Sequence, residues 1–168
     1  GQTFVESSLV SLNTESTLKG RYTFDDTGTL GNDSSPAGAY DGTVSGATAV
    51  VDGTRGNVLT FDGNDYVQMS GHFGNPANVT LAAWVNLTAA DTSGAEVISL
   101  GDSLSLRLDD GSGNMTGFFY NGSTWKNVTY ATTLAGTGWH HVAYTFNDAG
   151  NVQKLYLDGV QVASIAET

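Results

Sequence analysis

Short runs in which apolar and polar residues alternate recur along the chain, and turn-forming residues separate them. Alternation with a period of two puts apolar side chains on one face of a β-strand and polar side chains on the other. The 168 residues include 22 glycines but only 2 prolines, a balance that suits short strands joined by tight turns. The sequence therefore predicts an all-β fold, either a sandwich or a barrel.

The alternating runs indicate where the strands begin and end. Strands are expected at residues 20–24, 58–61, 66–69, 79–87, 96–100, 104–108, 115–120, 126–130, 139–146 and 154–157. Apolar alternations flank an Asp-Gly pair at two places, Asp62-Gly63 and Asp158-Gly159. Because Asp-Gly favours the positive φ angles of tight hairpin turns, we expect hairpins over residues 59–67 and 155–162.

The length of the chain suits one domain, which we expect over residues 18–168. Residues 1–17 are interpreted as a leader or linker to a neighbouring module. An edge strand is the alternative, since residues 3–5 suit a strand although Val5, Leu9 and Leu12 follow helical spacing.

The charge of the chain excludes several classes of partner. The formal net charge is -11, and the 6 Lys and Arg residues are too few to neutralise a phosphate backbone. Neither nucleic acid nor an anionic membrane surface is therefore expected as a partner. No apolar run approaches the ~20 residues that span a bilayer, and no signal-peptide pattern is seen, so we expect a mature soluble protein. With no cysteine, disulfides and thiolate chemistry are excluded.

Several segments, taken in order, resemble the laminin-G-like, concanavalin A-like jelly-roll family. They are residues 18–26, 33–35, 40–44, 56–67, 79–86, 138–146 and 155–160. The resemblance implies an antiparallel two-sheet jelly roll, no catalysis in most members, a frequent calcium ion at the rim, and carbohydrate or protein ligands on secreted or cell-surface proteins. The family usually closes with one more strand, which this sequence lacks after residue 165. We expect a truncated domain, a domain split by an insertion, or an N-terminal segment in that place.

The carboxylates and histidines do not form a known catalytic pattern. Glucanases of this fold carry Glu-x-Asp-x-x-Glu on one strand, and none of the four glutamates lies in such a motif. His140 and His141 are adjacent in a predicted strand, so they point to opposite faces and are expected to be structural. The sequence therefore predicts a protein that is not an enzyme.

Calcium is the cofactor that the residues favour. Asp25, Asp26, Asn32 and Asp33 bracket one turn and offer the oxygen ligands that calcium prefers. The alternative is that the two aspartates cap a strand while Asn32 and Asp33 form an Asx-turn. The resemblance favours the metal.

Sugar recognition needs exposed aromatic rings beside short polar groups. Tyr120, Asn121 and Trp125 offer this mixture around one loop, although Trp125 has cross-strand packing as its alternative. Trp84 and Trp139 lie within strongly alternating strands and are expected in the core.

These observations favour a calcium-supported adhesion module that binds carbohydrate or a cell-surface glycan. Its expected location is the cell surface or the secreted fraction, and its acidic, lysine-poor composition resembles that of bacterial adhesin modules. The alternative is a structural spacer that positions neighbouring domains of the same polypeptide and has no ligand of its own.

Overall fold

The computed structural model describes residues 18–71, 76–89, 95–109 and 111–166. These residues contain β-strands and no helix, and every strand pair is antiparallel. The all-β, antiparallel class is therefore confirmed. No helix that could cross a membrane occurs in this part of the chain. The interpretation of residues 1–17 falls outside the described residues and stays a prediction.

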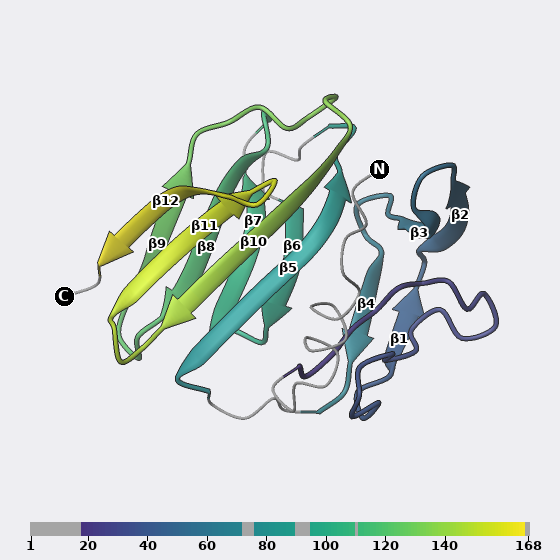
Figure 1. Cartoon of the computed structure of the whole chain (residues 1–168), viewed down its shortest axis with the longest axis horizontal. Helices are drawn as coiled ribbons and strands as arrows, with labels where there is room; N and C mark the ends of the chain where they lie inside the picture. Colours follow the sequence, from purple (N-terminus) through teal and green to yellow (C-terminus); the bar gives the residue numbers. More distant parts are fainter. Residues whose placement is uncertain (1–17, 72–75, 90–94, 110, 167–168) are drawn as a thin grey trace, which may run out of the picture. The chain divides into compact units, whose positions relative to one another are not determined.

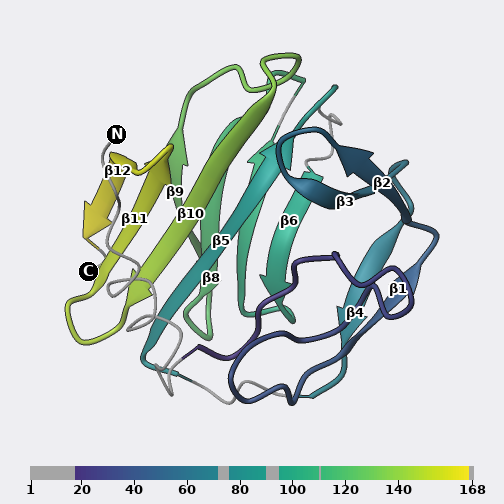
Figure 2. The same ribbon diagram turned by 45° about the vertical axis from the view of Figure 1, so that its right-hand side comes forward.

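The chain divides into two compact units, residues 1–73 and 74–168. The described part of the first unit has four short strands, β1 (Gly42–Ser45), β2 (Thr48–Asp52), β3 (Gly56–Thr60) and β4 (Tyr66–Met69). β1 pairs with β4 and β2 pairs with β3, as two separate two-stranded sheets (Figures 1 and 2). The expectation of one domain over residues 18–168 stays a prediction.

Two sequence predictions for the first unit are wrong. Residues 20–24 form no strand, and Phe24 has a φ of 61°, which an extended strand does not tolerate. Residues 59–67 form no hairpin, because β3 and β4 pair with other strands. The loop between them closes on itself instead: the Asp62 N–H donates to Asp65 Oδ2 at 2.9 Å.

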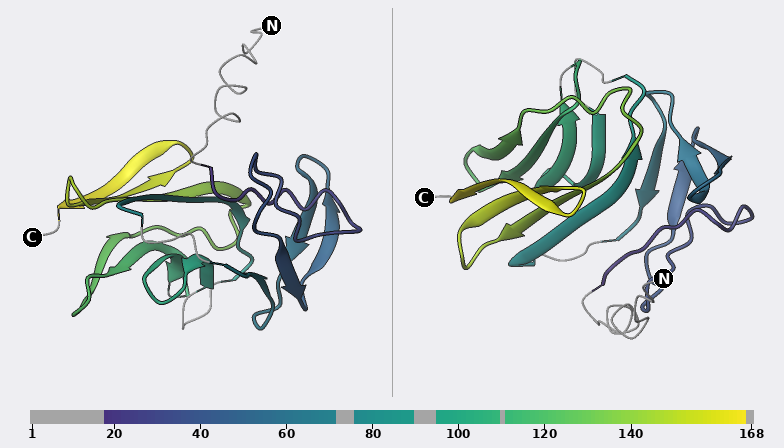
Figure 3. Two further views of the ribbon diagram at one scale, coloured as in Figure 1. Left: turned by 90° about the horizontal axis from the view of Figure 1, so that it is seen from below. Right: turned by 45° about the horizontal axis from the view of Figure 1, so that its top comes forward.

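The second unit is a two-layer sandwich (Figure 3). One sheet has the order β12-β11-β10-β5 and the other the order β6-β7-β8-β9. The strands are β5 (Asn78–Asn86), β6 (Ala95–Leu100), β7 (Leu104–Asp109), β8 (Asn114–Tyr120), β9 (Trp125–Tyr130), β10 (Trp139–Asn147), β11 (Val152–Leu157) and β12 (Val160–Ala166). The alternating runs from residue 79 onwards thus predict β5 to β11 closely.

Apolar side chains from both sheets fill the space between the layers. Leu104, Leu106 and Leu108 alternate along β7 and are all buried, as period-two patterning requires. Phe119 of β8 meets Phe146 of β10 with ring centroids 4.5 Å apart. Each such fully buried side chain contributes about 1.5 to 3 kcal/mol, so this core is the main source of stability in the unit.

Tyr144 fits into this core because the strand opposite it carries a glycine. A Cβ atom on Gly117 of β8 would lie 2.2 Å from Tyr144 Cδ2, closer than any real contact. The buried Tyr144 hydroxyl donates to Gln153 Oε1 at 2.7 Å, which satisfies its polar end. The tyrosine ring therefore replaces the side chain that β8 lacks.

The predicted hairpin over residues 155–162 is confirmed. β11 and β12 are joined by Asp158 and Gly159, whose φ angles of 50° and 81° are those of a type I′ turn. The Asp158 carboxylate also accepts bonds from His140 Nδ1 at 2.8 Å and from the His141 N–H at 2.9 Å. These bonds, with that of His140 first, lower the pKa of Asp158.

Candidate functional site

Tyr120 and Trp125 form an exposed aromatic pair at the end of the β8–β9 hairpin. They are the last cross-strand partners of the two strands, and their ring centroids lie 5.3 Å apart at an interplanar angle of 49°. Tyr120 is 41 % exposed and Trp125 is 52 % exposed. The sequence left two alternatives for Trp125, an exposed ring or cross-strand packing. Trp125 shows both, since it packs across the strands against Tyr120 and still presents its ring to solvent.

Asn121 holds the turn beside this pair. Its Oδ1 accepts the N–H groups of Ser123 at 3.0 Å and Thr124 at 2.9 Å, which makes it the side chain that closes the loop. The carbonyl end of Asn121 is thus committed to closing the turn next to the two rings.

The aromatic pair continues onto the face of its sheet that is turned away from the core, called the outer face here. Phe118 lies two residues before Tyr120 on β8 and therefore points to the same side. The Arg107 guanidinium of β7 lies over the Phe118 ring, 5.4 Å from its centroid. Arg107 Nε lies 3.9 Å from Glu96 Oε1 of β6. The sequence analysis missed these three residues, although period-two spacing from Tyr120 indicates Phe118.

The opposite sheet carries the second exposed tryptophan, and here the sequence prediction is wrong. Trp84 is 50 % exposed rather than buried, and it makes an edge contact with His141 at 5.2 Å between ring centroids. Leu81, Ala83 and Val85 of β5 face the core, so period two puts Trp84 on the other side. Trp139, also expected in the core, is half-buried.

The two adjacent histidines contact neighbouring side chains, and their structural role stays a prediction. His140 Nε2 lies 2.9 Å from Thr137 Oγ1, and its Nδ1 bonds Asp158, so both ring nitrogens have partners. The register puts His141 opposite Trp84 on β5, on the other face of the strand from His140.

Among the residues predicted to bind calcium, Asp33 is the best defined. It is 4 % exposed, and its carboxylate accepts the N–H groups of Arg21 at 3.0 Å, Ser35 at 2.9 Å and Tyr40 at 3.2 Å. Burial acts to raise the pKa of Asp33, but these bonds outweigh it and lower the pKa. The Asx-turn alternative accounts for the bond from Ser35, whereas the bonds from Arg21 and Tyr40 join Asp33 to more distant parts of the unit.

The other three predicted metal ligands lie in the same unit. The Asp26 carboxylate accepts the Thr29 hydroxyl and the Gly28 N–H, and these two bonds, in that order, lower its pKa. Asp25 and Asn32 are exposed. The described residues contain no group of three or more His, Asp or Glu side chains arranged to hold a metal ion.

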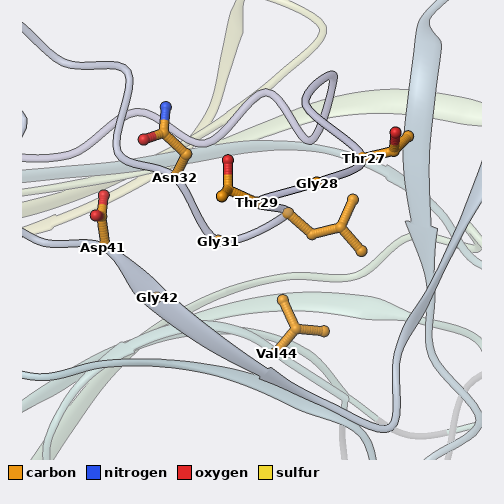
Figure 4. Close-up of a pocket in the computed structure, with 9 residues that line it drawn as sticks. Thr27, Gly28, Thr29, Gly31, Asn32, Asp41, Gly42 and Val44 are labelled. Carbon is orange, nitrogen blue, oxygen red and sulfur yellow. The ribbon is translucent and has the colours of Figure 1, made fainter.

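An open depression of about 390 Å³ lies beside this loop (Figure 4). Residues 27–32 line it together with Asp41, Gly42 and Val44. Its lining includes one carboxylate, that of Asp41, whose Oδ1 already accepts the Asp33 N–H at 2.8 Å. The depression has no aromatic ring in its lining, so it lacks the stacking surface that the sugar hypothesis requires.

Comparison with known proteins identifies a family for most of the chain. A family model of the laminin G type, described as the concanavalin A-like lectin/glucanases superfamily, matches residues 61–168. No curated protein matches the chain. The match spans β4 and all strands of the second unit, including the aromatic pair.

Proposed function

Because the chain belongs to the concanavalin A-like lectin/glucanase superfamily, we propose that it is a non-catalytic module that binds carbohydrate through Tyr120 and Trp125. The superfamily fits a binding module, and its name covers both lectins and glucanases. The observation that carries the proposal is the exposed aromatic pair. Sugar rings stack their apolar faces on such surfaces, and the Asn121 turn holds the pair in one orientation.

Binding of glycans at a cell surface or in the extracellular space is part of the proposal. The net charge of -11 supports a protein that stays soluble and keeps away from anionic surfaces. Neighbouring domains of the same polypeptide are the other proposed contacts.

Two tryptophans of nearly equal exposure give a matched test on a glycan array. Trp125→Ala removes half of the aromatic pair, whereas Trp84→Ala removes a ring that is 50 % exposed on the opposite sheet. We expect Trp125→Ala to lose about 1 to 3 kcal/mol of binding free energy, enough to abolish a weak array signal. Trp84→Ala should keep the signal of the unchanged protein.

Thermal melts of both variants serve as the folding control. Each should melt within a few degrees of the unchanged protein, since neither ring is in the core. Equal array signals for all three proteins would contradict the role of the aromatic pair. An unchanged protein that binds no glycan at all would favour the spacer alternative.

Calcium enters the proposal only as a test of the Asp25–Asp33 loop, where Asp25, Asp26, Asn32 and Asp33 are the predicted ligands. As arranged, these residues do not fit the ion well, since N–H and O–H donors already point at the carboxylates of Asp26 and Asp33. No step of sugar binding is therefore assigned to a metal. Thermal melts with calcium and with EDTA check this. If calcium raises the melting midpoint of the unchanged protein, and Asp25→Ala lowers the midpoint measured with calcium, the ion is assigned to the loop. Identical midpoints with calcium and with EDTA would exclude it.

A further inference from the structure

The outer face of the β6–β9 sheet carries polar and aromatic groups well beyond the aromatic pair. The register puts Phe118 between Ser105 on β7 and Asn127 on β9. Arg107 follows Ser105 by two residues on β7, on the same face, and pairs with Glu96 of β6. Ser105 is buried, so Asn127, Phe118 and Arg107 are the side chains that link Trp125 on one edge strand to Glu96 on the other.

The chemistry of these side chains matches that of sugar hydroxyls. Arg107 supplies donors and Glu96 supplies acceptors, while Asn127 supplies both. The contact of 3.9 Å between Arg107 Nε and Glu96 Oε1 is too long for a hydrogen bond, so the pair is held together by charge. Arg107 Nε itself is buried, but the two side chains are 39 % and 45 % exposed, so their other polar groups can bond to a ligand. The contact with the Phe118 ring holds the guanidinium against the sheet.

The charges on this face favour a neutral ligand. Among the described residues of this face, Arg107 is the one cation and Glu96 lies beside it, and the whole chain has a net charge of -11. An anionic polymer would be repelled by the acidic protein and would find one guanidinium that is already paired. Neutral hydroxyl groups can bond to both members of the pair without disturbing their charge balance.

The row of side chains from Trp125 to Glu96 is longer than one sugar ring. Trp125 and Glu96 lie on strands separated by three inter-strand spacings, which is about 14 Å across the sheet. We propose that the carbohydrate site extends from the Tyr120–Trp125 pair across the outer face to Arg107 and Glu96, and that it takes a neutral oligosaccharide of several sugar units. This inference rests on the proposed function, because it takes the aromatic pair as one end of the site.

Isothermal titration with neutral gluco-, manno- and galacto-oligosaccharides of one to six units tests the proposal. For the series that binds, we expect affinity to rise over the first several units. Arg107→Ala should lower the affinity for the longest oligomer about tenfold and leave that for the shortest bound oligomer unchanged. Trp125→Ala should lower the affinity at every length.

Two further variants keep the result interpretable. Glu96→Gln preserves shape and removes one acceptor charge, and it should weaken binding of the longest oligomer several-fold even if Arg107→Ala fails to fold. Lys154→Ala removes a cation from β11 of the opposite sheet and should have no effect at any length. Thermal melts establish that each variant is folded.

The outcomes separate the extended site from the aromatic pair. Affinity that is independent of length, or unchanged in both Arg107→Ala and Glu96→Gln, overturns the extension and leaves the aromatic pair standing. No binding to any neutral oligomer overturns both proposals. Tighter binding of an oligogalacturonate than of the neutral oligomer of equal length overturns the assignment of a neutral ligand.

Discussion

The two units are both made of antiparallel strands, but they bury different kinds of side chain. In the second unit, leucines, valines and aromatic rings are buried between two sheets. In the described part of the first unit, the buried residues with side chains are Ala47, Asp33 and Ser35, while Val51 is 83 % exposed. Apolar burial therefore stabilises the second unit, and hydrogen bonds around one carboxylate organise the first.

Because of this difference, the structure of the second unit is easier to predict from sequence than that of the first. Apolar side chains buried between layers must alternate along each strand, so the pattern is visible without coordinates. A buried carboxylate leaves no such periodicity. Asp33 meets Arg21, Ser35 and Tyr40 through backbone N–H groups, which every residue except proline has.

The largest expected effect comes from the core of the second unit. Leu106 is fully buried, so Leu106→Ala should destabilise the unit by about 3 to 5 kcal/mol. The matched change Leu59→Ala, at a half-buried position of β3, should cost about 1 kcal/mol or less. Denaturant unfolding of both variants measures the difference, and equal losses would refute the contrast between the units.

A smaller effect, confined to the first unit, is expected from Asp33→Ala. The change leaves without an acceptor the N–H groups that now donate to the carboxylate, which should lower the free energy of unfolding by about 1 to 3 kcal/mol. Amide hydrogen exchange should show lost protection at Arg21, Ser35 and Tyr40, with the β7 and β8 amides unchanged. The exposed Asp148→Ala serves as a control that should alter none of these amides.

The smallest effect is expected from acid. Because the pKa of Asp33 is lowered in the folded protein, its stabilising contribution is complete above the usual Asp pKa of about 3.9. That contribution is lost as the pH falls through the lowered folded value. Exchange measured from pH 5 downwards should show protection fall first around Asp33, and in Asp33→Asn this pH dependence should disappear. Equal pH dependence in both proteins would show that another group is responsible.

The strands of the second unit and the Asp158-Gly159 turn could be predicted because both have local signatures. The Asp62-Gly63 hairpin could not, since the same dipeptide also suits a loop whose flanking strands pair elsewhere. Trp84 shows another limit. The strong alternation of its strand was interpreted as a sign of the core, but alternation puts every second residue on the outer side, and Trp84 lies at one of those positions.

The part of the candidate site at the β8–β9 loop could be predicted from the sequence, but the part on the face of the sheet could not. Tyr120 and Trp125 are close in sequence, so one turn brings them together. Arg107 and Glu96 join Phe118 only through pairings between β6, β7 and β8, whose register depends on a bulge near Glu96. No spacing along the chain encodes that juxtaposition.

The missing side chain at Gly117 limits which substitutions this module can accumulate in evolution. Gly117 lies directly between Thr116 and Phe118, so the position that admits the Tyr144 ring belongs to the same stretch of β8 that presents the outer face. A larger residue there would push the strand outward and displace Phe118 with it. Descendants of this chain should therefore be free to exchange side chains on the outer face, and so acquire new specificities, only while position 117 stays glycine.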